Sequence, residues 1–215
     1  MDITYFGHSC FRLRGKSASL LTDPYDPKMV GLKYPKVSAD IVTVSHQHED
    51  HNNTSQVKDY KRIIDGPGEY EISGVSIIGI STYHDDKKGE SRGRNTIYVI
   101  EMDEIRLAHL GDLGHKLSEK VVGEIGSVDI IMIPVGGEYT INASVAAEVV
   151  RSIEPTITIP MHYQVQGLNP EIFKNLAKVD AFLSEVGLSV EKTNKFSFKK
   201  SDIGEDQKVV VIERK

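Results

Sequence analysis

The sequence has a single cysteine, Cys10. One cysteine excludes an intrachain disulfide bond and a structural zinc site made of several cysteines. No uninterrupted apolar run approaches the roughly 18 residues that a membrane helix needs, and residues 1–5 lack the basic segment and apolar stretch of a secretory signal. These absences predict a cytoplasmic protein with no membrane partner.

An excess of positive charge is missing as well. Lys and Arg number 26 against 31 Asp and Glu, which gives a formal net charge of -5. This balance argues against a protein that binds nucleic acid with its whole surface, although a local basic loop stays open. A chain of 215 residues with 39% hydrophobic residues is long enough for one sizeable core. We therefore expect a single globular domain over residues 1–215.

Histidines, by contrast, are concentrated in residues 46–51, His-Gln-His-Glu-Asp-His, directly after a short β-branched segment typical of a buried strand. Because alternate side chains of an extended segment share a side, His46 and His48 can bind one cation, and Asp50 and His51 can turn toward a second. A solvated loop, or a helix cap at Asp50, would explain any one of these residues. Four donors at one strand end favour a metal site, because the imidazoles need a partner that organises them.

Three more candidate ligands follow predicted strands further along the chain, namely His84, Asp112 and His162. Each of them alone is explained as well by an ordinary turn residue. Strands of one sheet end on a common edge, however, so these side chains can converge there with residues 46–51. Their repeated position after strands is the main evidence for a shared site.

The rest of the chain divides into two parts. Residues 2–23 alternate apolar runs with turns, which predicts antiparallel strands, and the proline-containing residues 24–40 predict a loop. We expect further strands at residues 62–64, 75–80, 96–101, 105–110, 129–133, 156–159, 189–191, 195–198 and 209–212, with hairpin turns at 73–74 and 102–104. Capping residues predict helices from Ser118 to about Ile125, from Asn142 to about Ile153, and from Asn169 to Gly187.

In order and context these motifs resemble the metallo-β-lactamase superfamily, whose fold belongs to the α/β class and is a four-layer αβ/βα sandwich with metals at one edge. The His-x-His-x-Asp-His run is that family's most specific signature. Further motifs at residues 7–9, 66–70, 92–96, 109–112 and 134–137 look like a small stand-alone branch of metal-dependent hydrolases, more distantly similar to ascorbate-phosphate lactonase. The resemblance implies a first metal on His46, His48 and His84, a second on Asp50, His51 and His162, and a bridging Asp112.

The implied protein is a metal-dependent hydrolase of a small-molecule substrate. Two divalent cations can share a water and supply a metal-bound hydroxide at neutral pH, which would attack an ester, lactone, amide or phosphoester. Zinc is the expected metal, although nitrogen and oxygen ligands also admit manganese or iron. Asp50 would orient the hydroxide, and His8 and His109 are candidate catalytic residues that contact ligands or substrate.

Substrate contacts are predicted in two loops. The polar loop 85–94 carries Arg92 and Arg94, whose planar donors suit an anionic substrate. The alternative for this loop is a solvated tip. Gly136 and Gly137 would let the backbone approach the substrate, and a plain tight turn explains them equally well.

Two other functions stay open from the sequence. One is a phosphodiesterase or nuclease on short nucleic acid, in which Lys87, Lys88, Arg92 and Arg94 contact phosphate. The other is a non-catalytic, metal-containing module that binds a ligand. A structural metal site is normally closed and tetrahedral and often uses cysteines, which seven nitrogen and oxygen ligands fit poorly. The sequence leaves a homo-oligomer open.

Overall fold

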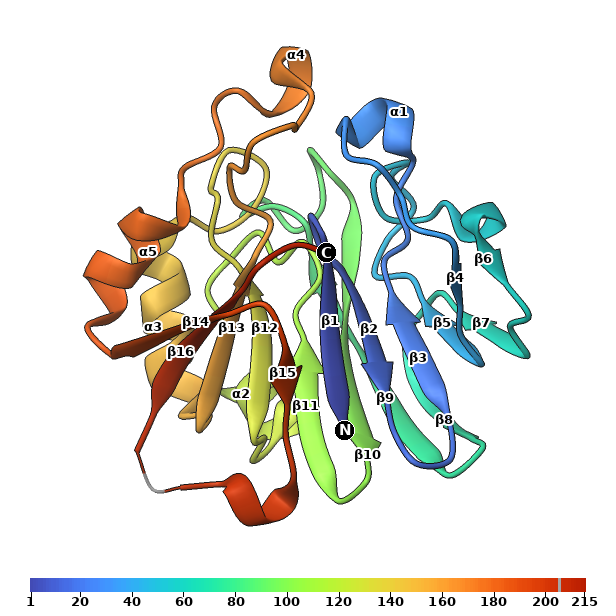
Figure 1. Cartoon of the computed structure of the whole chain (residues 1–215). Helices are drawn as coiled ribbons and strands as arrows, with labels where there is room; N and C mark the ends of the chain where they lie inside the picture. Colours follow the sequence, from blue (N-terminus) through green and yellow to red (C-terminus); the bar gives the residue numbers. More distant parts are fainter. Residues whose placement is uncertain (205) are drawn as a thin grey trace.

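Two mixed β-sheets pack face to face at the centre of the molecule (Figure 1). The structure is a computed structural model, and it describes residues 1–204 and 206–215. The first sheet has the strand order β15 (Phe196–Ser197), β1 (Asp2–Gly7), β2 (Cys10–Arg14), β3 (Ser19–Thr22), β5 (Ile41–Thr43) and β7 (Arg62–Ile64). The second has the order β14 (Ser189–Thr193), β16 (Lys208–Ile212), β13 (Ile157–Met161), β12 (Ile130–Pro134), β11 (Ile105–His109), β10 (Arg94–Met102), β9 (Val75–Tyr83) and β8 (Gly68–Ile72).

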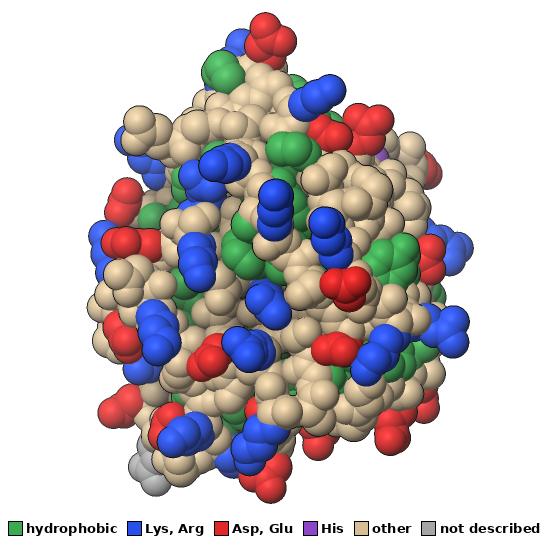
Figure 2. Space-filling model, turned by 45° about the vertical axis from the view of Figure 1, so that its right-hand side comes forward, with side chains coloured by type: hydrophobic (Ala, Val, Ile, Leu, Met, Phe, Trp, Pro, Cys, Tyr) green, Lys and Arg blue, Asp and Glu red, His purple; other side chains and the backbone are tan. Residues whose placement is uncertain are grey.

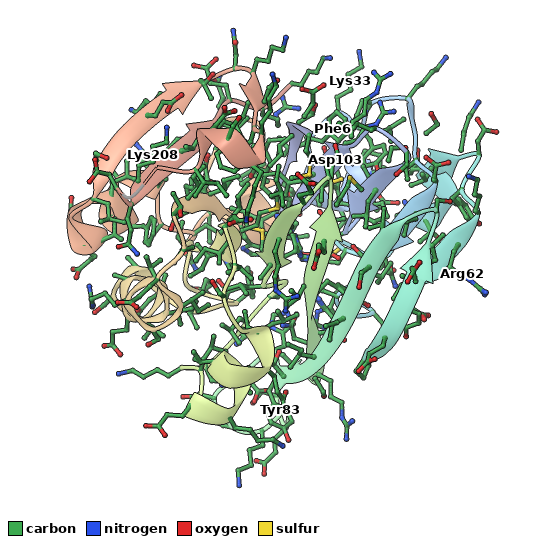
Figure 3. All side chains as sticks on the ribbon, turned by 90° about the horizontal axis from the view of Figure 1, so that it is seen from below. Phe6, Lys33, Arg62, Tyr83, Asp103 and Lys208 are labelled. Carbon is green, nitrogen blue, oxygen red and sulfur yellow. The ribbon has the colours of Figure 1, made fainter. Side chains whose placement is uncertain are left out.

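The main core lies between the two sheets. Alternate residues of a strand point to opposite faces, so each sheet sends one row of apolar side chains inward. Ile3 and Leu13 of the first sheet pack with Ile100, Met132 and Ile159 of the second in one buried cluster. Seen from below, Lys208 of β16 lies on one side of the molecule and Arg62 of β7 on the other (Figure 3).

The outer faces of the two sheets are covered differently. Helices α2 (Glu119–Ile125), α3 (Ala143–Ile153) and α5 (Val179–Val186) bury a second apolar cluster against the eight-stranded sheet. The outer face of the six-stranded sheet is covered by residues 24–40 and 52–60, on either side of β5 in the sequence, which contribute Tyr25, Leu32 and Val57 to a third cluster. These segments contain α1 (Pro27–Val30), β4 (Val37–Ser38), a short 3-10 turn at Thr54–Gln56 and β6 (Val57–Lys58). The result is an α/β sandwich, as the sequence predicts.

Most local predictions are confirmed. β1, β2 and β3 are antiparallel neighbours, and Ser118 and Asn142 cap α2 and α3 by accepting hydrogen bonds from backbone N–H groups. The turn at residues 73–74 joins β8 to β9, with both residues at positive φ as a two-residue hairpin requires. The hairpin at residues 102–104 joins β10 to β11.

The helix predicted from Asn169 to Gly187 is wrong. The segment forms a one-turn helix, α4 (Pro170–Phe173), and then α5, with a turn and an irregular stretch between them. The Ala177 N–H donates to the carbonyl oxygen of Gly136 at 2.8 Å, and the Ala177 carbonyl accepts from the Gln164 N–H at 2.9 Å. These long-range backbone bonds replace the helical bonds that a continuous helix would form.

The sequence also missed smaller elements. Residues 24–40, predicted as a loop, contain α1, whose first turn is capped by the Asp26 side chain and which ends at Gly31 with positive φ. The strand β8 was not predicted, because glycines and alternating glutamates give it little apolar signal. Another short 3-10 turn lies at Lys200–Asp202. Among the described residues, no helix is long and apolar enough to cross a membrane.

Candidate metal centre

The predicted ligands come from the ends of strands in both sheets and meet at one edge of the sandwich. His8 follows β1, and residues 46–51 follow β5, all in the six-stranded sheet. His84, Asp112 and His162 follow β9, β11 and β13 of the eight-stranded sheet. Three groups have ligand atoms within 4.8 Å of one another: His46, His48 and His84; His8, Asp50, His51 and His162; and His46, His51 and Asp112.

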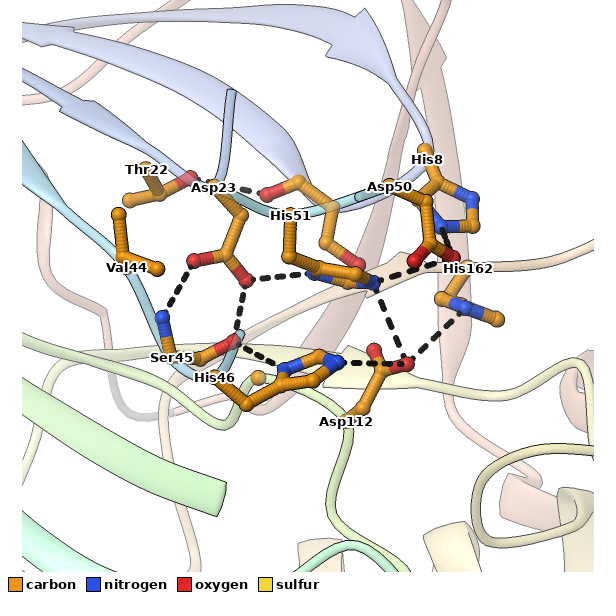
Figure 4. Close-up of polar contacts among 12 residues, drawn as sticks. His8, Thr22, Asp23, Val44, Ser45, His46, Asp50, His51, Asp112 and His162 are labelled. Carbon is orange, nitrogen blue, oxygen red and sulfur yellow. Dashed lines mark hydrogen bonds and ion pairs between the residues drawn. The ribbon is translucent and has the colours of Figure 1, made fainter. Parts of the chain in front are cut away.

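Asp112 contacts several histidines of this cluster (Figure 4). One of its carboxylate oxygens, Oδ2, is 3.2 Å from the Nε2 atoms of His51, His84 and His162, and 4.0 Å from Nε2 of His46. Burial opposes ionisation of Asp112, yet the charges of His162 and His51 hold the pKa of this carboxyl well below its usual range. A carboxylate therefore contacts histidines of both predicted metal groups.

The buried donor atoms fit a metal ion. Nε2 of His46, His51 and His162 and Oδ1 of Asp112 are buried and have no hydrogen-bond partner among the described residues. Buried polar atoms without partners are costly, and these four belong to groups whose ligand atoms converge. Burial, followed by the charge of His51, lowers the pKa of His46, which keeps that imidazole neutral, as metal binding requires.

A residue that the sequence did not identify, Asp23, sets the orientation of two ligands. Its buried carboxylate accepts hydrogen bonds from the Ser45 N–H at 2.8 Å, the Ser45 hydroxyl at 2.6 Å and Nδ1 of His51 at 2.9 Å. The Ser45 hydroxyl gives its only proton to Asp23, so Nδ1 of His46, 2.9 Å away, donates to that oxygen. In both imidazoles Nδ1 is thus a donor, which leaves Nε2 as the atom directed at the cluster. The signal was Asp23 at the exit of an apolar strand before Pro24.

His8 lies inside the cluster. Its Nε2 is 3.0 Å from Oδ2 of Asp50, and its ring centroid is 4.1 Å from that of His162. Burial, with the charge of His162, lowers the pKa of His8 to about 4. A neutral His8 can therefore hold the Asp50 carboxylate by donating from Nε2.

Comparison with known proteins identifies the family to which this fold belongs. A model of the beta-lactamase superfamily domain matches residues 2–162. The chain belongs to this superfamily. It is 30% identical over 205 residues to a UPF0173 metal-dependent hydrolase of Thermoplasma acidophilum. The aligned region covers 82% of this chain and 91% of the relative. A UPF0173 metal-dependent hydrolase of Methanopyrus kandleri is 28% identical over 89% of this chain and 95% of the relative.

Solved structures agree with the family match. A candidate zinc-dependent hydrolase of the metallo-β-lactamase superfamily from Thermotoga maritima is 39% identical, with a TM-score of 0.81 over 100% of this chain and 99% of that one. A metallo hydrolase from Ignicoccus hospitalis, 21% identical with a TM-score of 0.68, shares the fold over 99% and 94% of the two chains. The predicted family, the α/β sandwich and the class of metal-dependent hydrolase are confirmed.

In this superfamily member, His109 lies behind the cluster and does not line the cavity that opens onto it. Its Nδ1 accepts from the Gly111 N–H at 3.3 Å, so its Nε2 donates to the carbonyl oxygen of Ser9 at 2.9 Å. His109 therefore links the turn that carries His8 to the turn that carries Asp112. The sequence left two roles open for His109, contact with ligands or with substrate, and this geometry favours the first.

The predicted substrate residues divide into one that faces the cluster and three that do not. Arg92 lines a cavity of about 280 Å³ at the cluster, whereas Arg94 begins β10 and is exposed outside the cavity lining. Gly136 and Gly137 do not line it either. A Cβ atom on Gly136 would lie 2.1 Å from the carbonyl oxygen of His162, so this glycine lets two backbones pack closely beneath a ligand.

Proposed function

We propose that this chain is a dinuclear metal-dependent hydrolase that cleaves a small-molecule ester, lactone or phosphoester. The observation that carries the proposal is the position of Asp112, whose Oδ2 is equally distant, at 3.2 Å, from His84 of one ligand group and from His51 and His162 of the other. A carboxylate between two sets of imidazoles suits a bridging ligand. A single structural metal would not need both sets.

Seven side chains would hold the metals. We assign His46, His48 and His84 to a first cation, Asp50, His51 and His162 to a second, and Asp112 to both. Nitrogen and oxygen donors without cysteine suit zinc and also admit manganese or iron. A pair of bound divalent cations lowers the pKa of a shared water toward 7 and stabilises negative charge that develops on the substrate.

The protein groups around the cations have definite tasks. Asp23 fixes the ring orientation of His51 directly and of His46 through Ser45. His8 holds Asp50. Burial opposes ionisation of Asp50, but the charge of His51 keeps its pKa below the usual range, so Asp50 stays ionised and can accept a hydrogen bond. The bond from His8 to Oδ2 fixes the orientation of this carboxylate.

The nuclease alternative has less support. Arg92 is the one Lys or Arg side chain among the described residues that line the cavity. On the face shown in Figure 2, Lys and Arg side chains are scattered over the surface, and Asp and Glu side chains lie on the same face. Nucleic-acid sites usually present a continuous basic track. A cytoplasmic location stays a prediction, and a homo-oligomer stays open.

Metal content per chain tests the proposal. We expect about two metals per wild-type chain, purified without chelator, and at most one in Asp112→Asn. Asp180→Asn, an exposed aspartate on α5, is the matched control and should match wild type. The loaded wild type should hydrolyse members of a panel of esters, lactones and phosphodiesters, with at least a 100-fold lower rate in Asp112→Asn. One metal per chain that is insensitive to Asp112→Asn, or no hydrolysis across the panel, would overturn the proposal.

A further inference from the structure

The cavity at the metal cluster has a polar side and an apolar side. Its volume of about 280 Å³ is just below the usual range for small-molecule sites. The polar side is formed by the candidate ligands His48, Asp50, His84 and Asp112. The opposite side is formed by Met29, Arg92, Tyr139, Ile172 and Phe173. A substrate that fits here is small and has an apolar body.

The apolar side is tied together by hydrogen bonds between distant parts of the chain. The Asn169 side chain donates from Nδ2 to the carbonyl oxygen of Met29 at 3.2 Å. The Asn169 backbone N–H donates to the carbonyl oxygen of Val30 at 2.9 Å. These bonds attach α4 to α1. The Tyr139 hydroxyl donates to the carbonyl oxygen of Ile172 at 2.7 Å. The wall is therefore formed before substrate binds, which limits the size of what it admits.

Arg92 also lines the cavity, next to Tyr139. Its guanidinium carbon lies 5.4 Å from the centroid of the Tyr139 ring, and its Nη2 donates to the carbonyl oxygen of Glu138 at 3.2 Å. A guanidinium has five N–H donors, and this is the one hydrogen bond it donates among the described residues. Most of its donors remain available to a ligand.

The loop that carries Arg92 is itself fixed. The Asp85 carboxylate accepts four backbone N–H groups, from Lys87, Gly89, Ser91 and Arg92, at 2.7 to 2.9 Å. Asp85 directly follows the candidate ligand His84. The position of Arg92 is thus linked to the metal cluster by a short, hydrogen-bonded loop.

We propose that the substrate carries a single carboxylate at one end of a small apolar body, and that Arg92 binds this carboxylate and sets substrate specificity. The inference rests on the proposed hydrolase function. The scissile bond lies toward the metal cluster, and the apolar body contacts Met29, Ile172 and Phe173. The planar fork of an arginine matches the two oxygens of a carboxylate.

A phosphate group fits this site less well than a carboxylate. A phosphate carries close to two negative charges and three acceptor oxygens, and it is commonly met by several cations or backbone donors. Arg92 is the one Lys or Arg side chain of the described cavity lining. The single positive charge of one guanidinium neutralises the single negative charge of one carboxylate.

Binding of uncleavable probes tests this inference separately from catalysis. Calorimetric titration of the zinc-loaded protein with 4-methylbenzoate, the isosteric neutral 4-methylbenzamide and 4-methylphenylphosphonate would measure the preference for each terminal group. We expect the carboxylate to bind at least tenfold more tightly than the amide and more tightly than the phosphonate. Arg92→Gln should remove at least tenfold of the carboxylate affinity, and Arg92→Lys should recover only part of it. Arg151→Gln, an exposed arginine on α3, is the matched control.

Each outcome separates this inference from the proposed function. Equal carboxylate affinity in wild type and Arg92→Gln would show that the metals capture the carboxylate, and would overturn the inference. Tighter phosphonate binding, or no measurable binding of 4-methylbenzoate, would overturn it as well. Arg92-dependent binding in a protein that hydrolyses nothing would uphold the carboxylate site and refute the hydrolase.

Discussion

At the scale of single residues, the site depends on which nitrogen of each histidine carries the proton. His51 donates from Nδ1 to Asp23, and His46 donates from Nδ1 to the Ser45 hydroxyl. The opposite nitrogen of each ring, Nε2, is left to bind a cation, which displaces any proton that this nitrogen carries. Residues that hydrogen-bond to a metal-binding histidine commonly raise the metal affinity by 10 to 100-fold. Asp23 serves two ligands at once.

Replacement of Asp23 by asparagine should weaken zinc binding by roughly 10 to 100-fold. The amide group cannot accept hydrogen bonds at both of its heavy atoms. Either the Ser45 N–H, which donates to Oδ1, loses its acceptor, or the Ser45 hydroxyl and His51, which both donate to Oδ2, lose theirs together. Competition with a chromogenic chelator would measure the affinity. Asp40→Asn is a close control, because Asp40 also accepts from a serine N–H and hydroxyl, those of Ser19, without contacting a ligand. Similar zinc affinities for the two variants would contradict the assigned role of Asp23.

At the scale of elements, the sequence was informative where local pattern and tertiary structure agree. A β-branched run followed by donor side chains located the ends of β5, β9, β11 and β13, and so the candidate ligands. Asp23 could not be distinguished from an ordinary turn aspartate, because its partners lie more than twenty residues away. The break between α4 and α5 follows from the backbone bonds of Ala177 to Gly136 and Gln164. No local pattern encodes such bonds.

Asn169 shows how one side chain serves two elements. Its Oδ1 accepts from the Glu171 N–H at the start of α4, while its Nδ2 donates to Met29 in α1. Asn169→Ala removes both bonds and should lower the free energy of unfolding by about 1–2 kcal/mol, as measured by urea denaturation. Asn169→Asp keeps the cap and removes the donor, so amide exchange should become faster in α1. Asn142→Ala, which removes the cap of α3, should leave exchange in α1 unchanged. Unchanged exchange in Asn169→Asp would refute the link between the helices.

At the scale of the whole molecule, the candidate ligands are divided between the two sheets. His8 and residues 46–51 extend from the six-stranded sheet, and His84, Asp112 and His162 extend from the eight-stranded sheet. A cation bound between these two sets of side chains would join the two sheets at the edge where the ligands lie. Without it, buried imidazoles and carboxylates would have to satisfy one another, which they do incompletely. Metal binding should therefore stabilise the two sheets together.

Removal of metal should lower the melting temperature of the whole domain. At a free zinc concentration of about 100 times Kd, binding contributes about 2.7 kcal/mol, which corresponds to a shift of roughly 5–11 °C for a chain of this size. Calorimetry of chelator-treated protein, before and after zinc is restored, measures the shift. Asp112→Asn should recover less than half of it, because Asp112 contacts both ligand groups. Hydrogen exchange should slow on zinc addition in β5 and in β13 alike. Protection confined to one sheet would mean that the cation is held by one layer alone, and the bridging role of Asp112 would then fail.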